Sequence, residues 1–227
     1  MPVSAWPIRA NDALNAPLWR ERVQCLRSAP DACLPCLPAN ENILTLTDHT
    51  NLLVLSFGVI CWDRLGWKET FASRENTQRH YDDTYGSLER RFVATPPVVI
   101  NGHIDTVGNE RAELMRAVDE PELRANAPSV TLSGTNLTVA DAPVPAGWAD
   151  VCLVRCGPCT VHVPTQAGES GCRLLPHRNV VHQFVSISGS NGKAATYHLP
   201  AATNPAHRTA ILVQVVLGGP TIASFKN

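Results

Sequence analysis

Apolar and polar stretches alternate along the first 125 residues and divide them into segments of two kinds. Val23–Leu26 and Asn51–Cys61 are apolar runs, and the second is nearly continuous, as in a strand covered on both faces. Ala39–Thr47 and Ser73–Tyr85 have helical character. A strand–helix–strand start predicts a parallel strand pair joined by a right-handed crossover.

A hairpin and a third helix are predicted to follow. Val98–Ile100 and His103–Val107 are strand-like and flank Asn101-Gly102, a strong signal for a two-residue turn. Asn109 is predicted to cap the next helix, whose first turn carries Glu110. The order strand, helix, strand, helix, hairpin, helix is that of a thioredoxin-like α/β domain.

Beyond about residue 126 the pattern changes to short runs rich in Val, Thr and Ile, separated by Gly, Pro and Asn. These runs are Ser129–Leu132, Leu137–Ala140, Asp150–Val154, Thr160–Val163, Val180–Ser188, Ala195–Leu199, Ala210–Leu217 and Thr221–Phe225. Their spacing is typical of an antiparallel sandwich or of strands that extend the first sheet. We therefore expect a thioredoxin-like domain over residues 1–125 and a β-rich domain or sheet extension over residues 126–227.

Composition and charge narrow the class of protein. Hydrophobic residues make up 44% and charged residues 17%, as in a soluble globular chain. The net charge of −1, without a Lys/Arg cluster, argues against nucleic acid or an anionic membrane as partner. No apolar run approaches the ~20 residues of a membrane span. Residues 1–18 lack the core of a signal peptide, so the chain as written is expected in the cytoplasm, or in the periplasm or outside the cell if a signal was trimmed.

The clearest candidate chemistry is the dithiol motif Cys33-Leu34-Pro35-Cys36, between the first predicted strand and the first predicted helix. Unpaired N–H groups and the dipole at a helix N-terminus favour a thiolate. Pro35 and Pro38 are tolerated only in the first helical turn, so the helix is predicted to begin near Cys36. Cys33 would then attack and Cys36 would resolve the mixed disulfide. The simpler alternative is a pair of small buried residues.

Two further positions are predicted near the dithiol. Thr95-Pro96 is a candidate cis peptide that would face the dithiol and offer backbone groups to a bound peptide, with a plain trans turn as the equal alternative. Cys61 follows the second predicted strand, whose carboxyl end would share a sheet edge with the first. It is therefore a candidate third thiol, although a buried residue beside Trp62 is the simpler interpretation.

A second Cys-x-x-Cys sequence, Cys156-Gly157-Pro158-Cys159, lies between two predicted strands rather than before a helix. Gly-Pro in that position indicates a turn. We interpret this motif as structural, with or without a local disulfide. A four-thiolate zinc site built from both motifs is a less favoured alternative because more than a hundred residues separate them.

Several segments together resemble a thioredoxin-like family catalogued as domain of unknown function 1223. Cys33–Asn40 is similar to its Cys-x-x-Cys-Pro-Pro-Ala-Asp, Cys61–Ser73 to its Trp-Asp-x-x-Gly-Trp, and Thr95–Gly102 to its Thr-Pro-Gln-x-Val-Val-Asn-Gly. Gly168–Gly171 and Asn179–Val181 resemble its C-terminal pattern. The resemblance implies a thioredoxin-like domain with added β structure, usually in exported bacterial proteins, and a thiol–disulfide activity that is not established.

The chain departs from this family at several positions near the dithiol. Gly58 and Ile60 stand where the family usually has His and Asp, and Cys61 replaces an aromatic residue. Asn40 replaces an Asp and Pro97 a Gln. Loss of a His and a carboxylate removes the groups best able to tune a thiol pKa or to move protons.

The leading hypothesis is a thiol–disulfide oxidoreductase that acts on a protein or small-molecule thiol or disulfide and needs no cofactor. Cys33 and Cys36 would be catalytic, and Thr95-Pro96 would shape the edge that binds the substrate. The candidate substrate contacts are Trp62, Asp63, Trp67 and Pro97.

Two alternatives remain open from the sequence. A soft metal ion, Cu(I) or Zn(II), could be held by Cys33, Cys36 and Cys61 in a metal-binding or delivery protein. The chain could also be a non-catalytic binding module on the same fold, with its β-rich half contacting a partner. The oligomeric state is not indicated.

Overall fold

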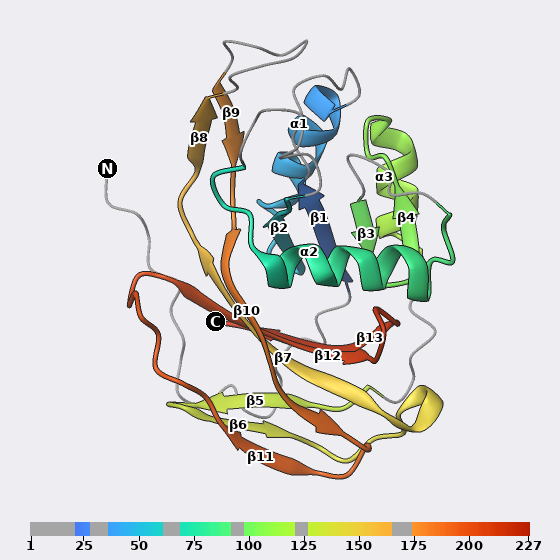
Figure 1. Cartoon of the computed structure of the whole chain (residues 1–227), viewed down its shortest axis with the longest axis vertical. Helices are drawn as coiled ribbons and strands as arrows, with labels where there is room; N and C mark the ends of the chain where they lie inside the picture. The colour runs from blue at the N-terminus through green and yellow to red at the C-terminus, as the bar shows by residue number, and fades with distance from the viewer. Residues whose placement is uncertain (1–20, 28–35, 61–68, 92–97, 121–126, 165–173) are drawn as a thin grey trace.

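A computed structural model of the chain describes residues 21–27, 36–60, 69–91, 98–120, 127–164 and 174–227 (Figure 1). These residues form a mixed α/β structure, which confirms the coarse fold class expected from the sequence. Within these ranges, no helix is long and apolar enough to cross a membrane.

The first half of the chain supplies the α-helices of the described residues and four strands of the main sheet. Its elements are β1 (Glu21–Arg27), α1 (Cys36–Leu46), β2 (Leu52–Gly58), α2 (Arg74–Tyr81), a π-helical turn (Asp82–Ser87), β3 (Val98–Ile100), β4 (Ile104–Thr106) and α3 (Arg111–Val118). β1 pairs in parallel with β2 and antiparallel with β3, and β3 forms a hairpin with β4. The predicted parallel unit and hairpin are therefore confirmed.

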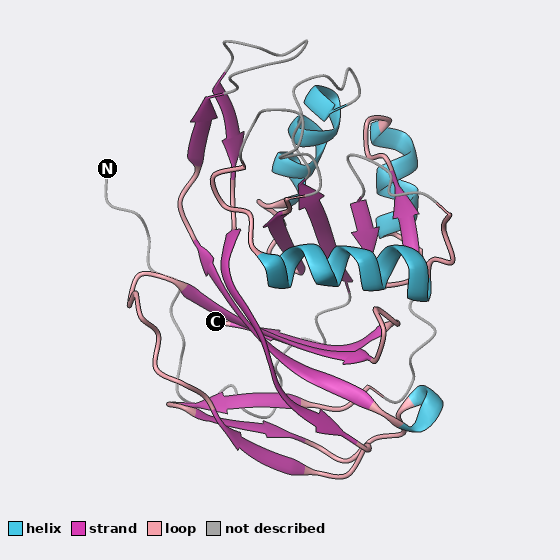
Figure 2. Ribbon diagram, in the orientation of Figure 1, coloured by secondary structure: helices cyan, strands magenta, loops and turns pink. Residues whose placement is uncertain are grey.

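The second half is almost entirely β structure. Its strands are β5 (Val130–Ser133), β6 (Asn136–Val139), β7 (Ala149–Gly157), β8 (Val161–Pro164), β9 (Leu174–His177), β10 (Val180–Ser190), β11 (Ala195–His198), β12 (Arg208–Val215) and β13 (Thr221–Lys226). Four of them extend the main sheet, whose order is β13-β12-β7-β10-β2-β1-β3-β4. β11-β6-β5 form a second sheet and β8-β9 a two-stranded ribbon. The structure thus contains both an extension of the first sheet and a second sheet packed on it (Figure 2).

Two local expectations need correction. β9 was not expected, because a run of four residues that contains Pro176 has little strand character. The N-cap of α3 is Glu110 rather than Asn109, and Glu110 makes no side-chain cap. The backbone carbonyl of Asn109 instead accepts a hydrogen bond from Nδ2 of Asn42, 3.0 Å away, which ties α3 to α1.

β2 is buried along its whole length because helices cover both faces of the sheet at this point. On one face, Leu52 and Val54 pack in a cluster with residues of α1 and α3, including Ile43 and Leu114. On the other face, the ring of Phe57 lies 5.3 Å below the guanidinium carbon of Arg79 in α2. The continuous apolar pattern of this segment reflects that double covering.

The two halves meet along the side of β2 that faces β10, where side chains replace part of the strand pairing. Ser56 N–H donates to the backbone oxygen of Asn179 (3.1 Å), and Nδ2 of Asn179 donates to the carbonyl of Val54 (2.9 Å). Nζ of Lys226, at the end of β13, donates to the carbonyl of Leu52 (2.6 Å). β2 pairs with β10 at only one residue, and these hydrogen bonds satisfy backbone groups of β2 that the strand pairing leaves over.

Candidate functional site

Three strand ends meet at one edge of the main sheet. Arg27, the last residue of β1, is paired with Gly58, the last residue of β2. β3 runs the other way and enters the sheet at Val98, opposite Cys25. α1 connects two parallel strands and therefore begins on the side where those strands end, at Cys36. This carboxyl edge is where ligands gather in open α/β sheets.

Cys36 is the first residue of α1, as the positions of Pro35 and Pro38 predicted. The first turn of the helix carries no acidic residue, so no carboxylate there opposes a thiolate. The other predicted site residues lie outside the described ranges, and their roles, including the candidate cis peptide, stay predictions. They are Cys33, Cys61, Trp62, Asp63, Trp67, Thr95, Pro96 and Pro97.

The β8–β9 ribbon lies against α1, a contact that the sequence did not indicate (Figure 1). Nδ2 of Asn40, in the second turn of the helix, donates to the backbone oxygen of Pro176 in β9 over 2.9 Å. Asn40 stands where the resembling family has Asp, and an amide can donate this bond whereas an ionised carboxylate cannot. The C-terminal half therefore contacts the helix that begins with Cys36.

One of the departures from the family, Gly58, has a structural role here. Gly58 is paired with Ala72, and a Cβ at Gly58 would lie 2.6 Å from the carbonyl carbon of Phe71. Only glycine allows this close approach of two backbones. Ile60 donates its N–H to Oγ1 of Thr77 (3.0 Å), which anchors the start of α2. The backbone packing therefore requires glycine at position 58, whereas the hydrogen bond at position 60 is made by the backbone and does not depend on the Ile60 side chain. Neither residue carries an acid–base group.

The second Cys-x-x-Cys sequence links β7 to β8 without a helix, in agreement with a structural turn. Cys156 is buried and Cys159 is exposed, and both thiols are free, so the local disulfide is not formed. Burial raises the pKa of Cys156 to about 11, which keeps its thiol protonated at neutral pH.

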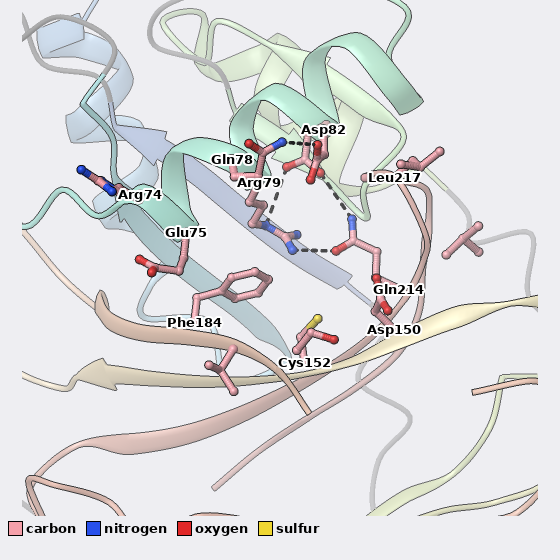
Figure 3. A pocket seen from close by; sticks show the side chains of 15 residues that line it. Arg74, Glu75, Gln78, Arg79, Asp82, Asp150, Cys152, Phe184, Gln214 and Leu217 are labelled. Atoms are coloured by element: carbon pink, nitrogen blue, oxygen red, sulfur yellow. Dashed lines mark hydrogen bonds and ion pairs between the residues drawn. The ribbon is translucent and has the colours of Figure 1, made fainter. Parts of the chain in front are cut away.

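A pocket of about 500 Å³ lies between α2 and the face of the sheet formed by β7, β10 and β12 (Figure 3). Arg79 is buried at its inner wall, where Nη1 donates to Oε1 of Gln214 (2.6 Å) and Nε lies 3.7 Å from Oδ2 of Asp83. The guanidinium carbon is 5.3 Å from the ring centroid of Phe57 and 4.8 Å from that of Phe184. The sequence pattern does not indicate this group, apart from the i, i+4 spacing of Arg79 and Asp83.

Burial dominates the electrostatics around α2. It raises the pKa of Asp83, and the positive charge of Arg79 opposes that shift. It also raises the pKa of Asp150, an effect that the nearby Asp82 reinforces. His80 is 0% exposed, and burial lowers its pKa to about 4. At neutral pH His80 is therefore neutral, and its Nε2 has no hydrogen-bond partner among the described residues.

The buried imidazole predicts acid sensitivity. Because the pKa of His80 is about 4 in the folded chain and 6.5 otherwise, the unfolded state binds more protons between these values. The contribution of neutral His80 to the free energy of unfolding is complete above about pH 6.5. It falls as the pH drops toward 4, by up to about 3 kcal/mol. Urea unfolding should show that the wild type has a lower free energy of unfolding at pH 4.5 than at pH 7. The difference between the two pH values should be smaller in His80→Gln. Equal losses in both proteins would contradict this prediction.

Comparisons with known proteins agree with the fold and name no activity. A model of the family described as protein of unknown function (DUF1223) matches residues 29–215. The crystal structure of protein AGR_C_4864 from Agrobacterium tumefaciens is similar with a TM-score of 0.71 and 23% identity, over 91% of this chain and 92% of that one. No curated protein matches. At this identity the structural likeness supports the fold alone.

Proposed function

Because the chain belongs to the DUF1223 family, whose function is unknown, we propose an activity from its own residues: thiol–disulfide exchange by Cys33 and Cys36 on a thioredoxin-like fold. The observation that carries the proposal is the start of α1 at Cys36, on the edge where β1 and β2 end. A dithiol at that helix start benefits from the unpaired N–H groups of the first turn, which stabilise a thiolate.

The arrangement of the first half supports the thioredoxin-like part of the proposal. β2-β1-β3-β4 are neighbours in that order, with β1 and β2 parallel and β3 and β4 antiparallel. α1 and α3 share one face of the sheet, and α2 lies on the other. The order of these elements along the chain is the one that the sequence pattern predicted, and their arrangement in the sheet supports a thioredoxin-like frame.

The reaction proceeds by two exchanges of sulfur partners. The Cys33 thiolate attacks one sulfur of a substrate disulfide, breaks the S–S bond and releases one substrate thiolate. Cys36 then attacks Cys33, releases the second substrate thiol and leaves a Cys33–Cys36 disulfide. Two electrons pass to the substrate, so turnover needs an external dithiol. Thr95-Pro96 and Pro97 would bind the substrate backbone, with Trp62, Asp63 and Trp67 beside them.

Replacement of the attacking thiol should abolish the activity. With dithiothreitol as reductant and a disulfide-bonded protein as substrate, Cys33→Ser is expected to reduce the rate by about 100-fold or more, since serine cannot form the mixed disulfide. Cys159→Ser removes an exposed thiol outside the proposed site and should leave the rate unchanged. A Cys33→Ser variant as fast as the wild type would reject the proposal.

Metal analysis of the same proteins separates the alternatives. Stoichiometric Cu(I) or Zn(II) in the wild type that is lost in Cys33→Ser, Cys36→Ser and Cys61→Ser would favour a metal-binding protein. A wild type without activity or metal would favour a non-catalytic binding module. Within the described ranges, no group of three His, Cys, Asp or Glu side chains could hold a metal ion.

A further inference from the structure

Three aromatic rings pack together where β10, the start of β12 and the turn before α2 meet. The imidazoles of His182 in β10 and His207, just before β12, are stacked with ring centroids 4.4 Å apart and an interplanar angle of 15°. The ring of Phe71 packs edge-to-face with that of His182, with centroids 5.5 Å apart. The backbone of Phe71 lies against Gly58, the last residue of β2. The stack therefore connects the second half of the chain to the carboxyl edge of the first.

A local irregularity of β10 directs His182 into this stack. The pairing of β10 with β7 shifts register between Val181 and Gln183, which leaves His182 as the extra residue. Such bulges re-aim a side chain out of the regular alternation of a strand. The imidazole lies over Gly157 of β7, where an added Cβ would stand 3.1 Å from Nε2 of His182. Glycine at that position leaves room for the ring.

The hydrogen bonds of His207 show which form of its imidazole the fold holds. Oδ1 of Asn204 accepts the N–H of Ala206 (3.0 Å), which fixes the orientation of the Asn204 amide. Nδ2 of that amide therefore faces Nε2 of His207, 3.3 Å away, and it can only donate. Nε2 of His207 is thus the unprotonated acceptor, and a proton taken up there would break this hydrogen bond.

Neutral imidazoles suit this stack and charged ones oppose it. Two imidazolium rings with centroids 4.4 Å apart would repel each other. Burial, followed by the charge of His207, lowers the pKa of His182 from its ordinary value of 6.5. The unfolded chain therefore binds protons more readily than the stack does. The stack is complete above about pH 6.5 and weakens as the pH falls below that value.

The charged groups of the surrounding elements add to this repulsion or are engaged elsewhere. Arg208, the first residue of β12, brings a further positive charge next to the stack. On β7, the thiol of Cys156 is uncharged at neutral pH, because burial raises its pKa to about 11. In the turn before α2, Oε1 of the buried Glu69 accepts the N–H of Phe71 (3.4 Å).

We infer that His182 and His207 form an acid-opened clasp, which holds the turn 204–207 against β10 at neutral pH and releases it when the pair takes up a proton. The segment that contains this turn is anchored at both ends. Nη2 of Arg155 donates to the carbonyl of Pro200 (2.9 Å), and β12 begins directly after His207. Opening therefore moves the turn while the strands keep their pairing, and it loosens the packing of His182 at the carboxyl edge. The inference does not depend on the proposed thiol chemistry.

Nuclear magnetic resonance of the full chain tests the clasp through the Overhauser effect between the two imidazoles. This signal is expected at pH 7.5 and should fall by about tenfold at pH 5, since uptake of one proton changes an equilibrium by up to tenfold per pH unit. The amide shifts of β12 should stay those of the folded chain at both pH values. That second readout separates local opening from acid unfolding.

His207→Phe keeps an aromatic ring in the stack but cannot be protonated. The contact between the ring at position 207 and His182 should therefore persist at pH 5, and His182 should titrate at a higher pH than in the wild type. His49→Gln removes an exposed imidazole outside the stack and should behave as the wild type does. The inference is overturned if the wild-type rings stay in contact at pH 5, if His207→Phe loses the contact to the same extent, or if β12 unfolds together with the turn.

Discussion

Replacing Arg79 by methionine is expected to destabilise the fold by about 3–5 kcal/mol. The side chains of Arg79 and Asp83 are 4% and 1% exposed, so the substitution leaves a carboxylate buried without its cation. It also removes the donor to Gln214 and a cation between the rings of Phe57 and Phe184. Urea denaturation followed by circular dichroism measures the free energy of unfolding.

Two further variants give the cause of that loss. Arg79→Met combined with Asp83→Leu removes both charges and should recover much of the stability, since an apolar pair of similar size has no desolvation cost. Arg90→Met breaks an ion pair with Asp105 at the surface and should have a far smaller effect. A single Arg79→Met variant that loses no more than Arg90→Met would show that the buried pair contributes little.

Truncating Phe57 to alanine is expected to lower the free energy of unfolding by a similar amount, about 3–5 kcal/mol. Its side chain is 0% exposed, and it packs edge-to-face on Phe184 with ring centroids 5.8 Å apart. The substitution opens a cavity in the cluster that joins β2 to β7, β10 and β12. Thermal unfolding monitored by calorimetry measures this change in the free energy of unfolding.

The control for this truncation is Phe225→Ala. Phe225 is only partly buried at the edge of the cluster between the two sheets, so the same loss of atoms should cost less. If Phe57→Ala were no more destabilising than Phe225→Ala, the cluster under α2 would be able to collapse around the missing ring.

Much of the first half could be predicted from short-range pattern. Asn101 and Gly102 both have positive φ, as the turn between β3 and β4 requires, and their sequence alone indicated that hairpin. The run through Phe57 indicated a strand covered on both faces because every residue in it is suited to burial. The start of α1 at Cys36 followed from the chemistry of proline.

The pocket beside α2 could not be predicted in this way. α2 has a polar sequence, and nothing local shows that Arg79 and Asp83 are buried against strands more than sixty residues later in the chain. Gln214, which completes their network, lies in a run that the pattern gives only as an apolar strand. Tertiary packing determines which of these residues contact each other, and the hydrophobic periodicity of the sequence carries no information about it.

β13 donates hydrogen bonds to segments that precede it by more than a hundred residues. Lys226 satisfies the carbonyl of Leu52, and the N–H of Thr221 donates to the carbonyl of Asn101 over 2.9 Å. During synthesis on the ribosome, Leu52 and Asn101 therefore gain these hydrogen bonds only after β13 has been made. Contacts of such long sequence separation slow folding and leave strand edges open to chaperones or to other nascent chains in the meantime.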